Sequence, residues 1–331
     1  MTKKVYNGLD LLKFIMALFV VMIHVKPNVH SDMLTTLFNP ILSIAVPVFF
    51  VLSSVLVFEK LTNVNGGGAA LIRYCKRLAI LYFSWLVVDA WFVLFRRSYL
   101  SDGFPQGFIE FVKDLFFATT YPGSWFLSAL FMSVLVVYFG IKAVGKSLML
   151  CVALLVSVYV YYIDSLPEPL HVFYDWYAFN VREDVVLSFP SQVIWVAIGM
   201  IIGTHLNMII SHKKRLLPVA VLLCVMCYGI TIFWHTLFVK YIWVISICLI
   251  GFLVDLSDKP IYRRIRNYSI LIFLFHFSIA GKMSVFCSVV GDSLVTNWIY
   301  YALVVVVSIV FAESVLRLEK IRFFVFLRYL H

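Results

Sequence analysis

Three ionisable residues share one face of the first apolar segment and are the groups in this chain best placed for chemistry. Residues 9–25 read LDLLKFIMALFVVMIHV, with Lys13 near one end and His24 near the other. In a helix at about 100° per residue, both side chains point within about 20° of one direction, about 16 Å apart along the axis. Asp10 lies within roughly 60° of the same stripe. Ionisable groups inside a bilayer usually face a bundle interior or a wet cavity, so the stripe predicts a polar path through the protein.

A simpler interpretation is that charged side chains near the helix end extend to the membrane interface. The position of Asp10 favours this simpler interpretation, and Lys13 fits both interpretations equally well. The simpler interpretation does not account for His24, which lies at the other end of the stripe.

The composition predicts a polytopic, all-α membrane protein. Of the 331 residues, 63% are hydrophobic and only 13% are charged, far from an ordinary soluble domain. Apolar runs long enough to cross a bilayer recur along the chain. They predict about ten transmembrane helices, at residues 9–25, 40–58, 78–95, 125–141, 148–163, 190–209, 216–234, 241–254, 269–289 and 298–316. The segments between them are too short to fold alone, so we expect one membrane domain over 1–331 with no separate soluble domain.

The net charge of +10 follows the predicted topology. With the N-terminus inside, most Lys and Arg residues fall in segments on the cytoplasmic side, which is the positive-inside pattern. It predicts that both termini are cytoplasmic and argues against a nucleic-acid partner. The six cysteines predict neither a disulfide framework nor a metal site.

A basic group precedes the third predicted span, with Arg73 and Arg77 one helical turn apart and Lys76 beside them. Such a cluster suits an anionic group, either a lipid headgroup or a nucleotide phosphate. Positive-inside anchoring explains it equally well.

Three further ionisable residues fall inside predicted spans: Asp89 in the middle of the third, His276 in the ninth and Glu313 in the last. Interhelical hydrogen bonding is the simpler interpretation for Asp89 and Glu313, whereas His276 is equally consistent with a functional role. The extracytoplasmic segment 164–189 combines aromatic and acidic residues, which suits either a carbohydrate-binding surface or a membrane-interface belt.

Motifs along the chain carry a family resemblance. They are VPVFFVLSSVL in the second span, RYCKRLAILYFSW entering the third, GSWFLSAL entering the fourth, and the stretch from Ser269 to His276 in the ninth. Together with Asp10, Lys13 and His24, in this order and spacing, they resemble the membrane-bound acyltransferase-3 family over nearly the whole chain. The first helix of that family reads Asp-x-x-Arg, ten residues, then His, so Lys13 replaces the usual arginine. Lysine binds as a point charge and not through a bidentate fork.

The resemblance implies a bacterial inner-membrane enzyme that moves an acyl group, commonly acetyl, from cytoplasmic acyl-CoA to an extracytoplasmic glycan or glycolipid. It implies His24 as general base or transient acyl carrier, and Lys13 as the cation that attracts the CoA phosphates or holds the thioester. The remaining implied residues are Arg73, Lys76 and Arg77 for nucleotide docking, His276 and Ser53 for proton transfer or orientation, and Asp10, Trp125 and Glu313 in support.

Two other classes of protein fit parts of the pattern. A proton-coupled transporter or exporter of a glycan or small solute would also use intramembrane histidines and acids. The sequence contains no inverted repeat and no paired Gly/Pro-broken spans, which argues against it. A sensory or assembly module would tolerate substitution of His24.

Overall fold

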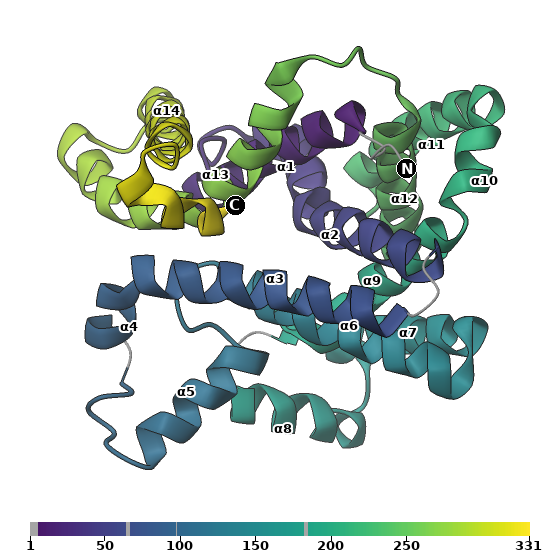
Figure 1. Ribbon diagram of the computed structural model, residues 1–331, viewed down its shortest axis with the longest axis horizontal. Coiled ribbons are helices and arrows are strands. Elements are labelled where there is room, and N and C mark those ends of the chain that lie inside the picture. The colour runs from purple at the N-terminus through teal and green to yellow at the C-terminus, as the bar shows by residue number, and fades with distance from the viewer. Residues whose placement is uncertain (1–5, 64–66, 97, 182–184) are drawn as a thin grey trace. The chain divides into compact units, whose positions relative to one another are not determined.

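Every regular element in the described part of the chain is a helix. A computed structural model describes residues 6–63, 67–96, 98–181 and 185–331, without the side chains of 62–63, 67, 96 and 282–289 (Figure 1). Six of its helical segments are long and apolar enough to cross a membrane, and two shorter ones, Lys146–Tyr161 and Leu237–Leu253, are also apolar. The prediction of an all-α polytopic membrane protein is confirmed.

Each of the ten predicted spans overlaps a helix, although the sixth, 190–209, runs past the helix end at Thr204 into a separate short helix. The ten helices are α1 (Asn7–Val25), α2 (Asp32–Asn63), α3 (Gly67–Val88), α6 (Ser124–Val144), α7 (Lys146–Tyr161), α9 (Phe189–Thr204), α11 (Lys213–Phe233), α12 (Leu237–Leu253), α13 (Pro260–Val290) and α14 (Leu294–Leu318). Several extend beyond the apolar run, because a helix continues through polar residues once its backbone bonds are formed.

The prediction of one continuous helix over the third span, residues 78–95, is wrong near its C-terminal end. Helix α3 stops at Val88, Asp89 forms a buried turn, and a separate helix, α4 (Ala90–Arg96), follows. The Asp89 amide donates to the carbonyl of Trp85 at 2.9 Å, and the Asp89 carbonyl accepts from the amide of Phe92 at 2.9 Å. Asp89 therefore marks the junction of two helices and not the middle of one.

The connecting segments contain helices that the hydropathy pattern did not predict. They are α5 (Gln106–Phe117), α8 (Val172–Val181), α10 (Leu206–Ser211) and the 3₁₀ segments Ile163–Ser165, Glu168–Leu170, Val185–Leu187 and Arg322–Leu330. Phe173, Trp176 and Phe179 are exposed on α8. An exposed aromatic face in a connecting segment of a membrane protein is typical of the interface region.

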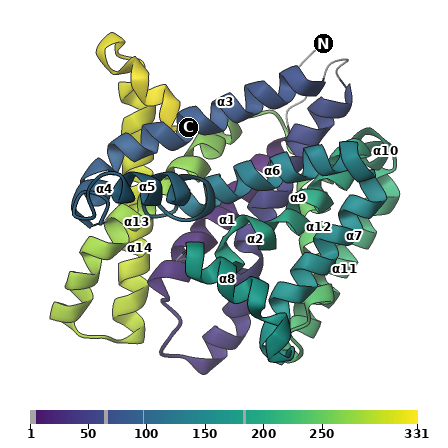
Figure 2. The same ribbon diagram turned by 90° about the horizontal axis from the view of Figure 1, so that it is seen from below.

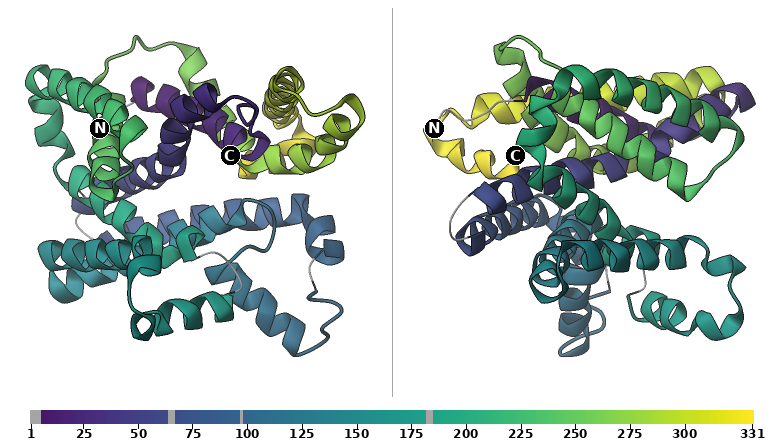
Figure 3. Two further views of the ribbon diagram at one scale, coloured as in Figure 1. Left: turned by 180° about the vertical axis from the view of Figure 1, so that it is seen from behind. Right: turned by 90° about the vertical axis from the view of Figure 1, so that its right-hand side faces the viewer.

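The chain divides into two compact units. Unit 1 comprises Met1–Phe49 and Asn207–His331, and unit 2 comprises Phe50–Leu206. In unit 1, α1 packs along α13 and contacts α12 and α14, while α11 pairs with α12 and α13 pairs with α14 (Figures 1 and 3). In unit 2, α9 packs between α6 and α7 (Figure 2).

Small residues let α9 approach α2 closely within unit 2. A Cβ atom built on Gly199 would lie 1.9 Å from Ser54 Oγ and 2.7 Å from the carbonyl oxygen of Val51. One turn further along, a Cβ on Gly203 would lie 2.6 Å from the carbonyl oxygen of Val55. Glycines four residues apart are the usual means by which membrane helices bring their backbones together.

We expect Gly199→Ala to destabilise the protein by about 1–3 kcal/mol, because the new methyl group forces two backbones apart. The matched control is Gly229→Ala in α11, where an added Cβ meets nothing within 4 Å. The control should be neutral or stabilising by up to about 1 kcal/mol, since alanine is the better helix former. Thermal unfolding in detergent measures both, and equal melting temperatures for the two variants would contradict the prediction.

Candidate functional site

His24 lies in the last turn of α1, where the helix ends abruptly. Lys26 adopts a left-handed conformation at φ 51° and ψ 53°, and its amide donates to the carbonyl of Met22. The His24 side chain is exposed on one side and packs against α13 on the other. Its ring centroid lies 4.0 Å from that of Phe277 and 5.2 Å from that of His276. His24 is therefore packed against α13 on one side and exposed on the other.

The second histidine of this pair, His276, is fully buried. Its Nδ1 lies 3.0 Å from the carbonyl oxygen of Ile272, one turn earlier in α13. A carbonyl can only accept, so Nδ1 carries the proton and Nε2 has the lone pair. Nε2 is buried with no hydrogen-bond partner among the described residues. His276 thus brings an unused acceptor close to His24.

Asp10 is buried in an ion pair and its side chain does not reach the molecular surface, so the simpler interpretation favoured by its position is wrong. Arg266 Nε donates to Asp10 Oδ1 at 2.8 Å, and Arg266 Nη2 donates to Asp10 Oδ2 at 2.5 Å. The carboxylate is almost completely buried, and burial of a charge requires such pairing. This bidentate pair ties the start of α1 to α13.

Lys13 lies one turn after Asp10 on the unbroken helix α1 and is half-buried. Because α1 is continuous from Asn7 to Val25, Lys13 and His24 do lie on one helical stripe, as the spacing predicted.

At the His24 end of α1, hydrogen bonds among His30, Asp292 and Asn297 form a cluster, here called the polar clasp. His30 Nε2 lies 2.7 Å from Asp292 Oδ1, and Asn297 Nδ2 donates to the same oxygen at 3.0 Å. The hydrogen bond from His30 and, to a lesser extent, the one from Asn297 keep the pKa of the Asp292 carboxyl below its usual range. The clasp links the segment after α1 to the segment between α13 and α14, and sequence analysis did not find it.

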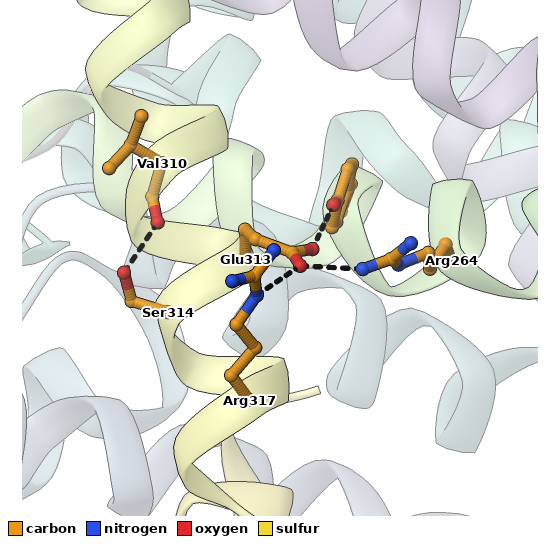
Figure 4. Close-up of polar contacts among 6 residues, drawn as sticks. Arg264, Val310, Glu313, Ser314 and Arg317 are labelled. Carbon is orange, nitrogen blue, oxygen red and sulfur yellow. Dashed lines mark hydrogen bonds and ion pairs between the residues drawn. The ribbon is translucent and has the colours of Figure 1, made fainter.

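The remaining predicted site residues divide between the units. Glu313 belongs to unit 1 and pairs with arginines of α13 and α14 (Figure 4). Unit 2 contains the others. Ser53 is half-buried, Trp125 is half-buried with its ring centroid 6.5 Å from that of Phe50, and the basic group of α3 is exposed at Arg73, Lys76 and Arg77.

A family model described as an acyltransferase domain, Acyl_transf_3, matches residues 6–315. The chain belongs to the acyltransferase-3 family. Among curated proteins and solved structures, no match to the chain is found. The matched range spans both units and includes every predicted site residue, so the resemblance drawn from the motifs is confirmed.

Acyltransferases need an accessible base, a cation or hydrogen-bond donor near the reacting carbonyl, and exclusion of water. Unit 1 of this membrane acyltransferase offers an accessible imidazole at His24 and a cation at Lys13 on the same helix. Sequence reasoning missed Arg266, because this residue was counted among the basic residues of the positive-inside pattern. The signal that would have found it is an acid, Asp10, inside an apolar segment, since such an acid needs a buried cation.

Proposed function

We propose that this membrane acyltransferase moves an acyl group, acetyl in the first instance, from cytoplasmic acyl-CoA to a hydroxyl of an extracytoplasmic glycan or glycolipid. The proposed location is a bacterial inner membrane, with both termini cytoplasmic. The observation that carries the proposal is the arrangement of Lys13 and His24 on α1, with His24 exposed and packed against His276. The positive-inside charge pattern puts Lys13 toward the donor and His24 toward the acceptor.

The transfer needs one proton acceptor and returns the proton to the leaving group. In the base mechanism, the His24 imidazole takes the acceptor hydroxyl proton as the oxygen attacks the thioester carbonyl. The tetrahedral intermediate collapses, the C–S bond breaks, and the imidazolium returns the proton to the thiolate as free CoA. In the carrier mechanism, His24 first attacks the thioester itself, the C–S bond breaks, and the thiolate takes the imidazole proton and leaves as free CoA. The acceptor hydroxyl then attacks the acyl-imidazole, the C–N bond breaks, and the hydroxyl proton returns to the imidazole. His276 orients the His24 ring in either case.

Lys13 is proposed to attract the donor, because a cation on the cytoplasmic part of the stripe suits the CoA phosphates. We expect Lys13→Met to raise KM for acetyl-CoA by about tenfold and Lys13→Arg, which restores the residue usual in the family, to leave it nearly unchanged. Lys214→Gln, an exposed position on α11, is the charge-matched control. Steady-state kinetics at varied acetyl-CoA measures the effect, and an unchanged KM in Lys13→Met would contradict it.

The direct test is release of free CoA thiol from acetyl-CoA by the purified protein in liposomes, supplied with a pooled cell-envelope glycan fraction. Acceptor-dependent release supports the proposal. Transport of a glycan or solute without thiol release would instead identify the transporter of the alternative interpretation. That alternative also uses intramembrane histidines, but it predicts no CoA consumption.

A further inference from the structure

Two arginines converge on one glutamate where α13 and α14 lie side by side near the predicted cytoplasmic surface. Arg264 Nη2 donates to Glu313 Oε1 at 2.5 Å, and Arg317 Nε donates to the same oxygen at 2.6 Å. The hydroxyl of Tyr268 donates to the other carboxylate oxygen, Oε2. Figure 4 shows both guanidinium groups meeting the carboxylate. Glu313 thus fixes two guanidinium groups next to each other.

Within the described part of the chain, most donors of these two arginines have no partner. A guanidinium has five N–H donors, and the described contacts of Arg264 and Arg317 use one nitrogen of each. Their side chains are 53% and 75% exposed. Arg266 provides the contrast, because it directs two nitrogens at Asp10 in a buried pair. The guanidinium groups of Arg264 and Arg317 therefore keep exposed donors beside their contact with Glu313, whereas Arg266 directs two nitrogens at a buried carboxylate.

The charge around the cluster is also unbalanced. One carboxylate faces two guanidinium groups. Exposed basic residues also lie nearby in the chain, at Arg263, Lys320 and Arg322. The next acidic residue along the chain, Glu319, already pairs with His331, whose Nε2 lies 2.7 Å from the Glu319 carboxylate. Excess positive charge on preorganised arginines is the usual means of binding phosphate, since the planar fork matches two phosphate oxygens.

We propose that Arg264 and Arg317, held next to each other and oriented by Glu313, bind a phosphate group presented from the cytoplasmic side. Two sources share this chemistry. One is the phosphate-bearing end of the acyl-CoA donor, which rests on the proposed function. The other is the headgroup of an anionic lipid in the cytoplasmic leaflet, which does not.

The test compares Arg264→Gln/Arg317→Gln with a control that loses the same charge elsewhere in unit 1, Lys214→Gln/Arg215→Gln on α11. Both control positions are exposed and make no described contact with Glu313. The first arm measures CoA binding by the protein in nanodiscs of phosphatidylcholine. The second measures phosphatidylglycerol retained per protein after purification from mixed phosphatidylcholine–phosphatidylglycerol nanodiscs.

A CoA phosphate at the cluster predicts that CoA binding falls about 100-fold in the arginine variant and less than about threefold in the control. A lipid phosphate predicts unchanged CoA binding and loss of phosphatidylglycerol retention in the arginine variant only. Equal behaviour of the two variants in both arms, or no binding of either ligand by the wild type, overturns the proposal.

Two further measurements separate this result from misfolding and from failure of the proposed function. Arg264→Lys/Arg317→Lys keeps both charges and loses the planar fork, so it should weaken binding about tenfold while melting like the wild type. CoA binding is measured without acceptor or turnover. A wild type that binds CoA at this cluster yet releases no thiol with any acceptor would overturn the proposed function and leave the phosphate site intact.

Discussion

His24→Ala should lower the rate of acyl transfer by about 10² to 10⁴, because a positioned general base contributes a factor of that size. The side chain is exposed, and its contacts among the described residues are ring contacts with Phe277 and His276, so its removal leaves no buried charge. We therefore expect the variant to melt within a few degrees of the wild type. A large loss of activity without loss of stability is what distinguishes a reacting group from a packing residue.

The measurement is acceptor-dependent release of CoA thiol in liposomes, with wild type and His24→Ala assayed side by side. His205→Ala is the matched control, because His205 is likewise exposed at a helix end, following α9. Its hydrogen bonds to described residues are with groups of the preceding helix, Thr204 and the Ile201 carbonyl. The control should keep full activity. If His24→Ala also transfers acyl groups at the wild-type rate, His24 has no role in the chemistry.

The same preparation decides between the two roles of His24. A transient acyl carrier releases up to one equivalent of CoA per protein in the absence of acceptor, because the acyl group moves to the imidazole first. A general base releases none until the acceptor hydroxyl is present. Rapid mixing of the wild type with acetyl-CoA alone, followed by thiol detection, measures the burst. The burst should be absent in His24→Ala under either mechanism that involves this residue.

The helices were predictable from sequence because a bilayer requires long apolar runs, and each of the ten expected segments overlaps a long helix in the structure. The turn at Asp89 was not predictable, since an acidic residue inside an apolar run is equally consistent with a position within a helix and with the end of a helix. The helices α5 and α8 were missed for a related reason. They are short and aromatic, and hydropathy does not distinguish an interfacial helix from a loop of the same composition.

The stripe of Asp10, Lys13 and His24 was predictable because its members lie on one helix, where spacing fixes direction. Their partners lie far away in the sequence. Arg266 is 256 residues from Asp10, and only the packing of α1 on α13 brings the two together. The contact between His24 and His276 arises from the same packing of α1 on α13. Single-sequence reasoning supplies the candidate groups of a membrane site but not their pairing.

The Asp10–Arg266 pair should respond asymmetrically to removal of either partner. Arg266→Ala leaves the carboxylate of Asp10 buried, at 2% side-chain exposure, with no cation beside it. We expect a loss of roughly 3–5 kcal/mol in the free energy of unfolding, the usual cost of breaking a buried pair from one side. Asp10→Ala leaves Arg266, which is 36% exposed and has a long stem that can reach the interface. That variant should lose only about 1–2 kcal/mol.

Denaturant or thermal unfolding in detergent measures both losses, with Arg263→Ala as the control, because Arg263 is exposed on the same helix. The double variant Asp10→Ala/Arg266→Ala should be more stable than Arg266→Ala alone, since removing the stranded carboxylate removes the main penalty. Equal losses for the two single variants would show that the pair is solvated and does not hold α1 against α13. If the pair does hold them, Arg266→Ala should also lower acyl transfer, because α1 is the helix on which Lys13 and His24 lie.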